Sequence, residues 1–191
     1  MMDARVTLKA LCVAVACYAT SAPVAAQVLD GDVDQLLNRL STLTPEHDAA
    51  EAARLAREIQ ERWTHSGSAT IDLLLQRGLR AMAAEDYPRA IAHLTALTDH
   101  APDFAEGWNQ RATAFFMMER YGPAISDIEQ VLILEPRHFG ALAGLGIMLE
   151  QLGDEAGALN ALRAAQEVHP AEANVNAAVE RLEQQTGGRT L

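Results

Sequence analysis

The feature that most constrains the fold of this 191-residue chain is a repeat with a period of 34 residues. Three prolines keep that spacing: Pro102, Pro136 and Pro170. Three alanines keep the same spacing: Ala90, Ala124 and Ala158. Such a period is typical of helix–turn–helix units that stack into a solenoid, because one hairpin is too small to bury its own apolar side. The period therefore predicts an all-α solenoid, and it favours a protein that holds a partner.

Offsets of 34 residues divide the chain into three units: 71–104, 105–138 and 139–172. Each unit places a large apolar residue early in its first helix: Leu74, Trp108 and Leu142. Four residues later each has a small residue, where the two helices of a unit can approach closely: Gly78, Ala112 and Gly146. The closing proline fixes φ and disfavours helical geometry in the residue before it, so it ends each second helix.

Together these positions resemble the tetratricopeptide repeat, over three units of 34 residues, or 102 of the 191. The resemblance implies a right-handed α-solenoid of three units, exported and bacterial in type. One departure is Ala81, which stands where the family has a larger apolar residue. In one variant of the repeat an arginine of the first helix pairs with an acid of the second. Arg111 and Asp127 fit that variant, whereas Arg77 would face His93.

Two helical segments flank the three units. Residues 173–186 carry one apolar stripe and are expected to form the polar-faced capping helix that solenoids need, followed by a flexible tail at 187–191. Residues 27–68 contain two further apolar stripes and predict a helical hairpin. This hairpin lacks the small-residue and proline marks of the repeat. We interpret it as a degenerate repeat that caps the first unit, with a separate docking module as the alternative.

The first 26 residues have the features of a secretory signal peptide. Arg5 and Lys9 accompany a short apolar stretch at 10–19, and Val24-Ala25-Ala26 resembles a cleavage site. The apolar stretch is too short to cross about 30 Å of hydrocarbon as a helix. Export to the periplasm with cleavage after Ala26 is therefore expected. The alternative is a lipoprotein anchored through Cys17.

Charge and composition narrow the classes of function. The chain has 26 acidic and 15 basic residues, a net charge of −11 that opposes binding to nucleic acid or to anionic membranes. No nucleophile elbow, phosphate-binding loop or HExxH motif is present, so we expect no enzyme activity. We also expect no cofactor and no metal site, because no two histidines stand four residues apart. The six histidines are expected to be solvated: His47, His65, His93, His100, His138 and His169.

The resemblance also implies a concave groove, lined by residues on the first helix of each unit that lie off the packing face. Carried over by the alignment, the groove residues are Leu75, Leu79, Met82, Asn109, Thr113, Phe116, Met117 and Ile147. Adaptable apolar side chains of this kind suit a protein partner. The alternative is that the N-terminal hairpin or the capping helix fills the groove.

These features predict a non-catalytic adaptor or scaffold in the bacterial periplasm. It would bind a peptide or a helix of another envelope protein, with no nucleic acid and no membrane span. Two alternatives are a structural solenoid that associates with itself end to end, and a lipid-anchored factor for envelope assembly. The sequence leaves the oligomeric state and the partner open.

Overall fold

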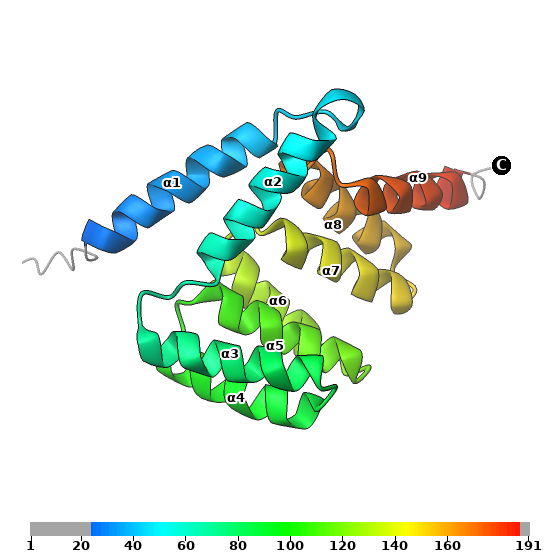
Figure 1. The fold of residues 1–191 in the computed structure, drawn as a ribbon. Coiled ribbons are helices and arrows are strands. Elements are labelled where there is room, and N and C mark those ends of the chain that lie inside the picture. The colour runs from blue at the N-terminus through cyan, green and yellow to red at the C-terminus, as the bar shows by residue number, and fades with distance from the viewer. Residues whose placement is uncertain (1–23, 188–191) are drawn as a thin grey trace, which may run out of the picture.

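The computed structural model describes residues 24–187, and the side chains of residues 32–185 within that range. These residues form helices and no strand (Figure 1). The helices are α1 (Val24–Leu40), α2 (Pro45–Trp63), α3 (Ala69–Ala83), α4 (Tyr87–His100), α5 (Ala105–Met117), α6 (Tyr121–Leu134), α7 (Phe139–Gln151), α8 (Glu155–Val168) and α9 (Ala173–Gly187).

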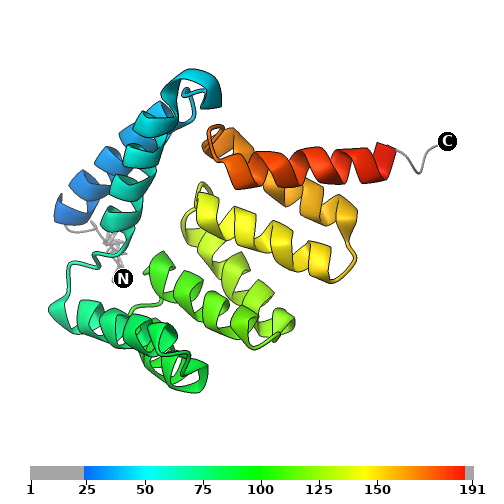
Figure 2. The same ribbon diagram turned by 45° about the vertical axis from the view of Figure 1, so that its right-hand side comes forward.

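The six helices α3 to α8 form three antiparallel hairpins that stack in sequence order (Figure 2). Each hairpin corresponds to one 34-residue unit of the sequence. At the far end, α9 packs on α8 and buries Val175, Val179 and Leu182 against Leu162. The described part of the chain is therefore an α-solenoid with a C-terminal cap.

Repeated local signals set where these helices begin and end. The carboxylates of Asp86 and Asp154 each accept a hydrogen bond from a backbone N–H three residues on, which caps α4 and α8. Each turn between paired helices contains one residue in the left-handed region, again at the 34-residue period: Glu85 (φ 56°), Glu119 (φ 57°) and Gly153 (φ 80°). The period therefore governs the turns as well as the helices.

Close approach between paired helices depends on the small residues that the sequence marks. Ala90, Ala124 and Ala158 are fully buried, each 0% exposed. A Cβ added to Gly146 would lie 2.5 Å from Cγ of Leu162, nearer than real carbon contacts allow. The same holds for Gly78 beside Leu94, at 2.7 Å. Larger residues at these positions would force the helices of a unit apart.

The N-terminal hairpin α1–α2 does not cap the first repeat, which corrects the expectation from the sequence. Its core side chains, such as Leu37 and Ile59, pack instead with Phe139 at the start of α7 and with Val168 at the end of α8. Arg137 reinforces this position through an ion pair with Asp34. In Figure 1, α1 and α2 lie at the upper left, and the linker before α3 separates them from the first repeat. The hairpin docks here because its aromatic end fits the turn between α6 and α7, a contact that no periodic pattern encodes.

Two predictions fall mostly outside the described residues. Of the signal peptide at 1–26, only residues 24–26 are described, and they begin α1. Of the tail at 187–191, only Gly187 is described, as the last residue of α9. Among the described residues, every helix is too short or too polar to cross a bilayer.

Candidate functional site

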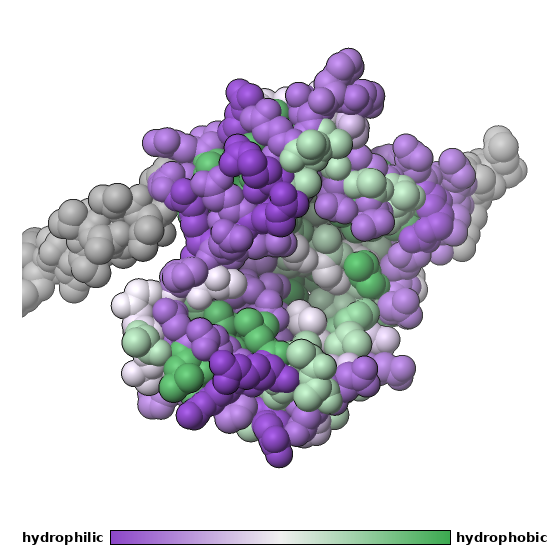
Figure 3. All heavy atoms as spheres, in the orientation of Figure 1, coloured by the Kyte–Doolittle hydropathy of each residue, from purple (hydrophilic) through white to green (hydrophobic). Residues whose placement is uncertain are grey.

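A hollow of about 170 Å³ lies between α5 and α7, with Ile128 of α6 behind it. Its lining combines small and apolar residues with two polar ones: Asn109, Ala112, Thr113, Phe116, Ile128, Gly140, Gly144, Ile147 and Met148. In Figure 3, hydrophobic residues surround a depression in the middle of this face, below the hydrophilic residues of α2. No residue of the hairpin α1–α2 lines the hollow.

Four of the groove residues expected from the sequence meet in this hollow. Asn109, Thr113 and Phe116 come from one side of α5, and Ile147 faces them from α7. Ile147 is 44% exposed, a large value for an isoleucine in a packed repeat. Three small residues keep the hollow open: Ala112, Gly140 and Gly144. A Cβ added to Gly144 would meet no atom within 4 Å, so the space in front of it is free.

The groove residues expected from the first unit do not take part. Leu75 is only 2% exposed and packs with Leu94, Leu97 and Ala114, so it belongs to the core and cannot contact a partner. It is buried because α5 packs across α3 at this point. Leu79 and Met82 are partly buried against the same cluster. Met117, at the end of α5, is 50% exposed but lies outside the hollow.

A buried acid holds the polar end of the hollow in place. Glu106 is 7% exposed, and its carboxylate accepts hydrogen bonds from Asn109 Nδ2 (3.1 Å) and Gln110 Nε2 (2.6 Å). A third partner is His138, whose Nε2 lies 3.2 Å from the same carboxylate. His138 Nδ1 accepts the backbone N–H of Ala141 (3.1 Å), so in the neutral ring the proton sits on Nε2 and points at Glu106. The amide of Asn109 is thus fixed by an unbroken chain of contacts.

That chain continues into the N-terminal hairpin. The indole ring of Trp63, at the end of α2, stacks on the ring of His138 with centroids 4.1 Å apart and planes 14° apart. Trp63 also contacts the ring of Phe139, at 5.2 Å. His138 is therefore only 3% exposed, and the expectation that it is solvated is wrong. The sequence held no local signal for this contact, since Trp63 and His138 lie far apart along the chain.

His169 is a second buried histidine beside this interface. It is 4% exposed, and its ring meets that of Phe139 edge to face at 5.5 Å. Burial lowers the pKa of His169 below its ordinary value, and the nearby carboxylate of Glu172 opposes that shift only in part. Two buried nitrogens here have no hydrogen-bond partner within the described residues: His169 Nδ1 and Trp63 Nε1. The expectation of solvated histidines fails here as well.

The ion pair implied by the repeat variant is present in the second unit. Arg111 donates two hydrogen bonds of 2.7 Å to the carboxylate of Asp127. The same guanidinium donates to the hydroxyls of Thr95 and Thr98 on α4, and it lies 4.7 Å from the centroid of the Trp108 ring. Arg111 therefore joins both helices of its own unit to the preceding unit. This role is structural.

The chemistry of the described residues offers no metal centre. Among the described side chains of residues 32–185, no three of histidine, cysteine, aspartate and glutamate come together in a way that could hold an ion. Glu106 and His138 are close, but their hydrogen bonds are already used to hold Asn109 and the start of α7. The arrangement suits recognition of an apolar side chain beside a polar group.

Comparison with known proteins identifies the architecture. The sequence model of the tetratricopeptide repeat matches residues 75–125 and 110–174. The chain belongs to the tetratricopeptide repeat (TPR) family. A TPR repeat-containing protein of Rhizobium etli is 40% identical over 159 residues, which is 83% of this chain and 76% of that protein.

Solved structures agree with this assignment at the level of the fold. The Sgt2 TPR domain from Aspergillus fumigatus is 22% identical, with a TM-score of 0.60 over 64% of this chain and 83% of that one. The type III secretion chaperone SycD of Yersinia enterocolitica, solved with a peptide of the translocator YopD, is 17% identical. Its TM-score is 0.59, over 62% of this chain and 96% of that one. At these identities the likeness shows a shared TPR solenoid.

Proposed function

We propose that this TPR protein is a non-catalytic adaptor that binds a peptide or helix of another protein in the hollow between α5 and α7. We propose further that it acts in the bacterial periplasm, where its partner is another envelope protein. The observation that carries the proposal is the hollow itself, which is mostly apolar, opens to the surface and has the 44% exposed side chain of Ile147 in its wall.

The lining fits a ligand that presents an apolar side chain next to a polar backbone. Phe116 and Ile147 form apolar walls on opposite sides, and Asn109 lies near them on α5. The side-chain NH₂ group of Asn109 donates a hydrogen bond to Glu106. Within the described residues, no group donates a hydrogen bond to the side-chain oxygen of Asn109. That oxygen can accept an N–H from an extended segment or a helix end. A few fixed polar groups in an apolar hollow are the usual basis for orienting a ligand.

A protein of similar fold binds a peptide of another protein. The Yersinia chaperone SycD was solved in complex with a peptide of a translocator. By analogy we propose a peptide as the partner of this chain, and we place it across α5 and α7 because the hollow lies there. The location is supported by the basic residues, the short apolar stretch and the small residues at the start of the sequence.

Site-specific crosslinking tests the hollow directly. A photoreactive residue at position 147 should crosslink a partner in native envelopes. The same residue at 133 should not, because Ile133 is 72% exposed on α6 and lies outside the hollow. With that partner purified, Ile147→Glu should weaken binding at least about tenfold, since a carboxylate would have to be desolvated against Phe116. Ile133→Glu is the matched control and should bind as the unchanged protein does.

Two outcomes would contradict the proposal. Equal crosslinking from both positions, or equal binding by both glutamate variants, would remove the hollow as the site. For the location, a fusion of residues 1–26 to alkaline phosphatase, which folds only after export, should be active. An inactive fusion would contradict the proposed location in the periplasm and would not bear on the proposed binding site.

A further inference from the structure

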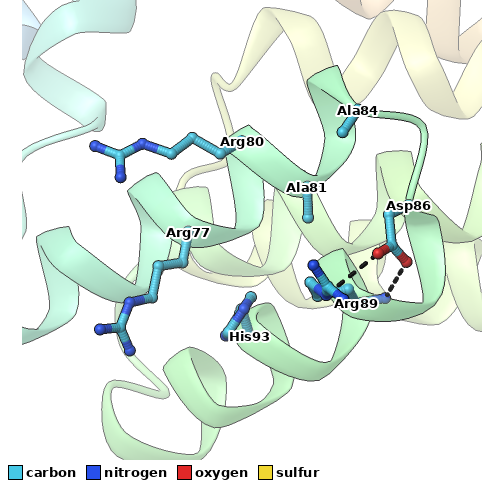
Figure 4. Close-up of a pocket in the computed structure, with 7 residues that line it drawn as sticks. All are labelled: Arg77, Arg80, Ala81, Ala84, Asp86, Arg89 and His93. Carbon is cyan, nitrogen blue, oxygen red and sulfur yellow. Dashed lines mark hydrogen bonds and ion pairs between the residues drawn. The ribbon is translucent and has the colours of Figure 1, made fainter.

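A second hollow, of about 190 Å³, opens between α3 and α4 at the start of the solenoid. Basic side chains dominate its lining, as Figure 4 shows: Arg77, Arg80, Arg89 and His93, with Asp86 as the one acid. In the figure Arg77 and Arg80 extend to the same side of α3, while Arg89 lies beside Asp86. The wall between the charged groups is apolar and includes Ala81.

This hollow is distinct from the site between α5 and α7. An α-helix turns about 100° per residue, so Arg77 and Arg80 lie on the side of α3 opposite to Leu75 and Leu79. The basic hollow therefore faces away from the side of α3 that packs against α5.

The equivalent surface of the second unit shows what this one lacks. In that unit Arg111 is held by Asp127 and by the threonines of the preceding unit. Ala114, the counterpart of Arg80, is fully buried against the first unit. The first unit has no repeat before it, because the hairpin docks on α7 and α8 instead. The surface that other units bury is here open to solvent.

Most of the positive charge on this surface is unpaired. Arg77 and Arg80 are exposed and form no ion pair with any side chain in the described part of the chain. His93 stands where the second unit has Asp127, so the usual partner for Arg77 is absent. Only Arg89 has an acid beside it, with Nε 3.2 Å from the carboxylate of Asp86.

Solubility explains why the exposed end of the solenoid is polar, but it does not explain why its charges have one sign. A terminal repeat needs a hydrophilic outer face. In a chain with 26 acids and 15 bases, acidic or mixed residues would meet that need. Three guanidinium groups around one hollow instead match a ligand with several carboxylates, since each guanidinium can hold a carboxylate through two hydrogen bonds.

We propose that this basic end surface, formed by Arg77, Arg80, Arg89 and His93, is a second docking surface that binds an acidic segment of a partner protein. The segment would place carboxylate side chains against the guanidinium groups and an apolar side against Ala84, which is exposed. The surface goes beyond the proposed groove and does not depend on it, so the two could engage one partner or two.

Fluorescence anisotropy on the full chain tests this surface with defined probes. The probes are a labelled alanine-rich peptide with glutamate at every fourth position and the same peptide with glutamine there. We expect the glutamate peptide to bind at least about tenfold more tightly, and more weakly as salt is raised. The double substitution R77Q/R80Q should abolish that preference. The controls R57Q, which removes an exposed arginine of α2, and I147E, in the groove, should keep it.

Three results would overturn the proposal. They are equal binding of both peptides, unchanged binding by R77Q/R80Q with a native circular dichroism spectrum, and displacement by inorganic phosphate at the same concentration of charge. The last result would make the surface a site for free anions. Unchanged groove binding by I147E, with the glutamate preference intact, would count against the groove alone.

Discussion

The stacked repeats and the N-terminal hairpin are joined to the molecule by different kinds of contact. Within the repeats, most buried side chains are apolar and tightly fitted, as with Leu94 and Leu97, both 0% exposed, and the buried acids Glu106 and Asp127 have hydrogen-bond partners. The hairpin docks through Trp63, His138 and Phe139, and two buried nitrogens at its interface have no hydrogen-bond partner in the described part of the chain. An unsatisfied buried polar atom costs stability. We therefore expect the repeats to unfold as one cooperative body and the hairpin to be the element most easily released.

Replacing an aspartate by alanine should destabilise the repeats far more than the hairpin. This difference in the free energy of unfolding is the largest effect that we predict. Asp127→Ala removes the acid from a pair whose side chains are 14% and 6% exposed, and it leaves Arg111 buried without its charge partner. Breaking such a pair costs about 3 kcal/mol. We expect the free energy of unfolding, measured by urea denaturation of the whole chain, to fall by about that amount.

Asp34→Ala is the matched change at the hairpin. Its pair with Arg137 is 63% and 36% exposed, and exposed pairs contribute about 0–1 kcal/mol. Arg137 also keeps a hydrogen bond to Asn38, at 2.7 Å. If the two variants lost the same stability, the repeats and the hairpin would not differ in the way described.

Removing the aromatic contact should release the hairpin and spare the repeats. Trp63→Ala takes away the ring that stacks on His138 and contacts Phe139. Burial of a large apolar side chain contributes about 1.5–3 kcal/mol, so docking should weaken by a similar amount. Amide hydrogen exchange over residues 33–63 should speed up, while exchange in α3 to α6 stays as it was.

Trp63→Phe provides the control, because a smaller ring can still stack on His138. Protection of the hairpin should then be largely kept. Unchanged exchange in Trp63→Ala would mean that the apolar cluster around Leu37 and Ile59 holds the hairpin without the aromatic stack. Faster exchange throughout α3 to α8 would mean that hairpin and repeats unfold together.

The contacts within the repeats could be predicted from the sequence, whereas those of the hairpin could not. The period predicted three helical pairs, and the tight contacts at Gly78 and Gly146 follow from the same marks. Each of these contacts joins two helices that are adjacent in the chain, so the residues that make it recur at the 34-residue period. In the site, the same register predicted Asn109, Phe116 and Ile147, which the structure brings together.

Contacts without a period could not be found in that way. Trp63 reaches His138 across two complete repeats, and nothing near either residue indicates the other. Leu75 shows the opposite error, since its register places it in the groove while the crossing of α5 over α3 buries it. Gly107 was also missed, although a Cβ there would lie 2.1 Å from Cδ2 of Leu97, because its contact is between units.

Acidification should weaken the docking of the hairpin more than the packing of the repeats. This is the smallest effect that we predict. Burial lowers the pKa of His169 while the hairpin is docked, and in the open state the ring would return to an ordinary pKa of about 6.5. Below that value the open state binds more protons, so docking loses stability as the pH falls and is unaffected above it. Exchange over residues 33–63 should therefore be several-fold faster at pH 5.5 than at pH 7.5.

His169→Gln separates this effect from the other titratable groups at the interface. Those groups are Glu106, His138, Glu172, and the pair of Asp34 with Arg137. Because glutamine cannot take up a proton in this range, the variant should lose most of the difference between the two pH values. If it kept the full difference, His138 or a carboxylate would be the sensitive group. If the hairpin exchanged at one rate at both pH values in the unchanged protein, its docking would be as insensitive to acid as the apolar contacts between repeats.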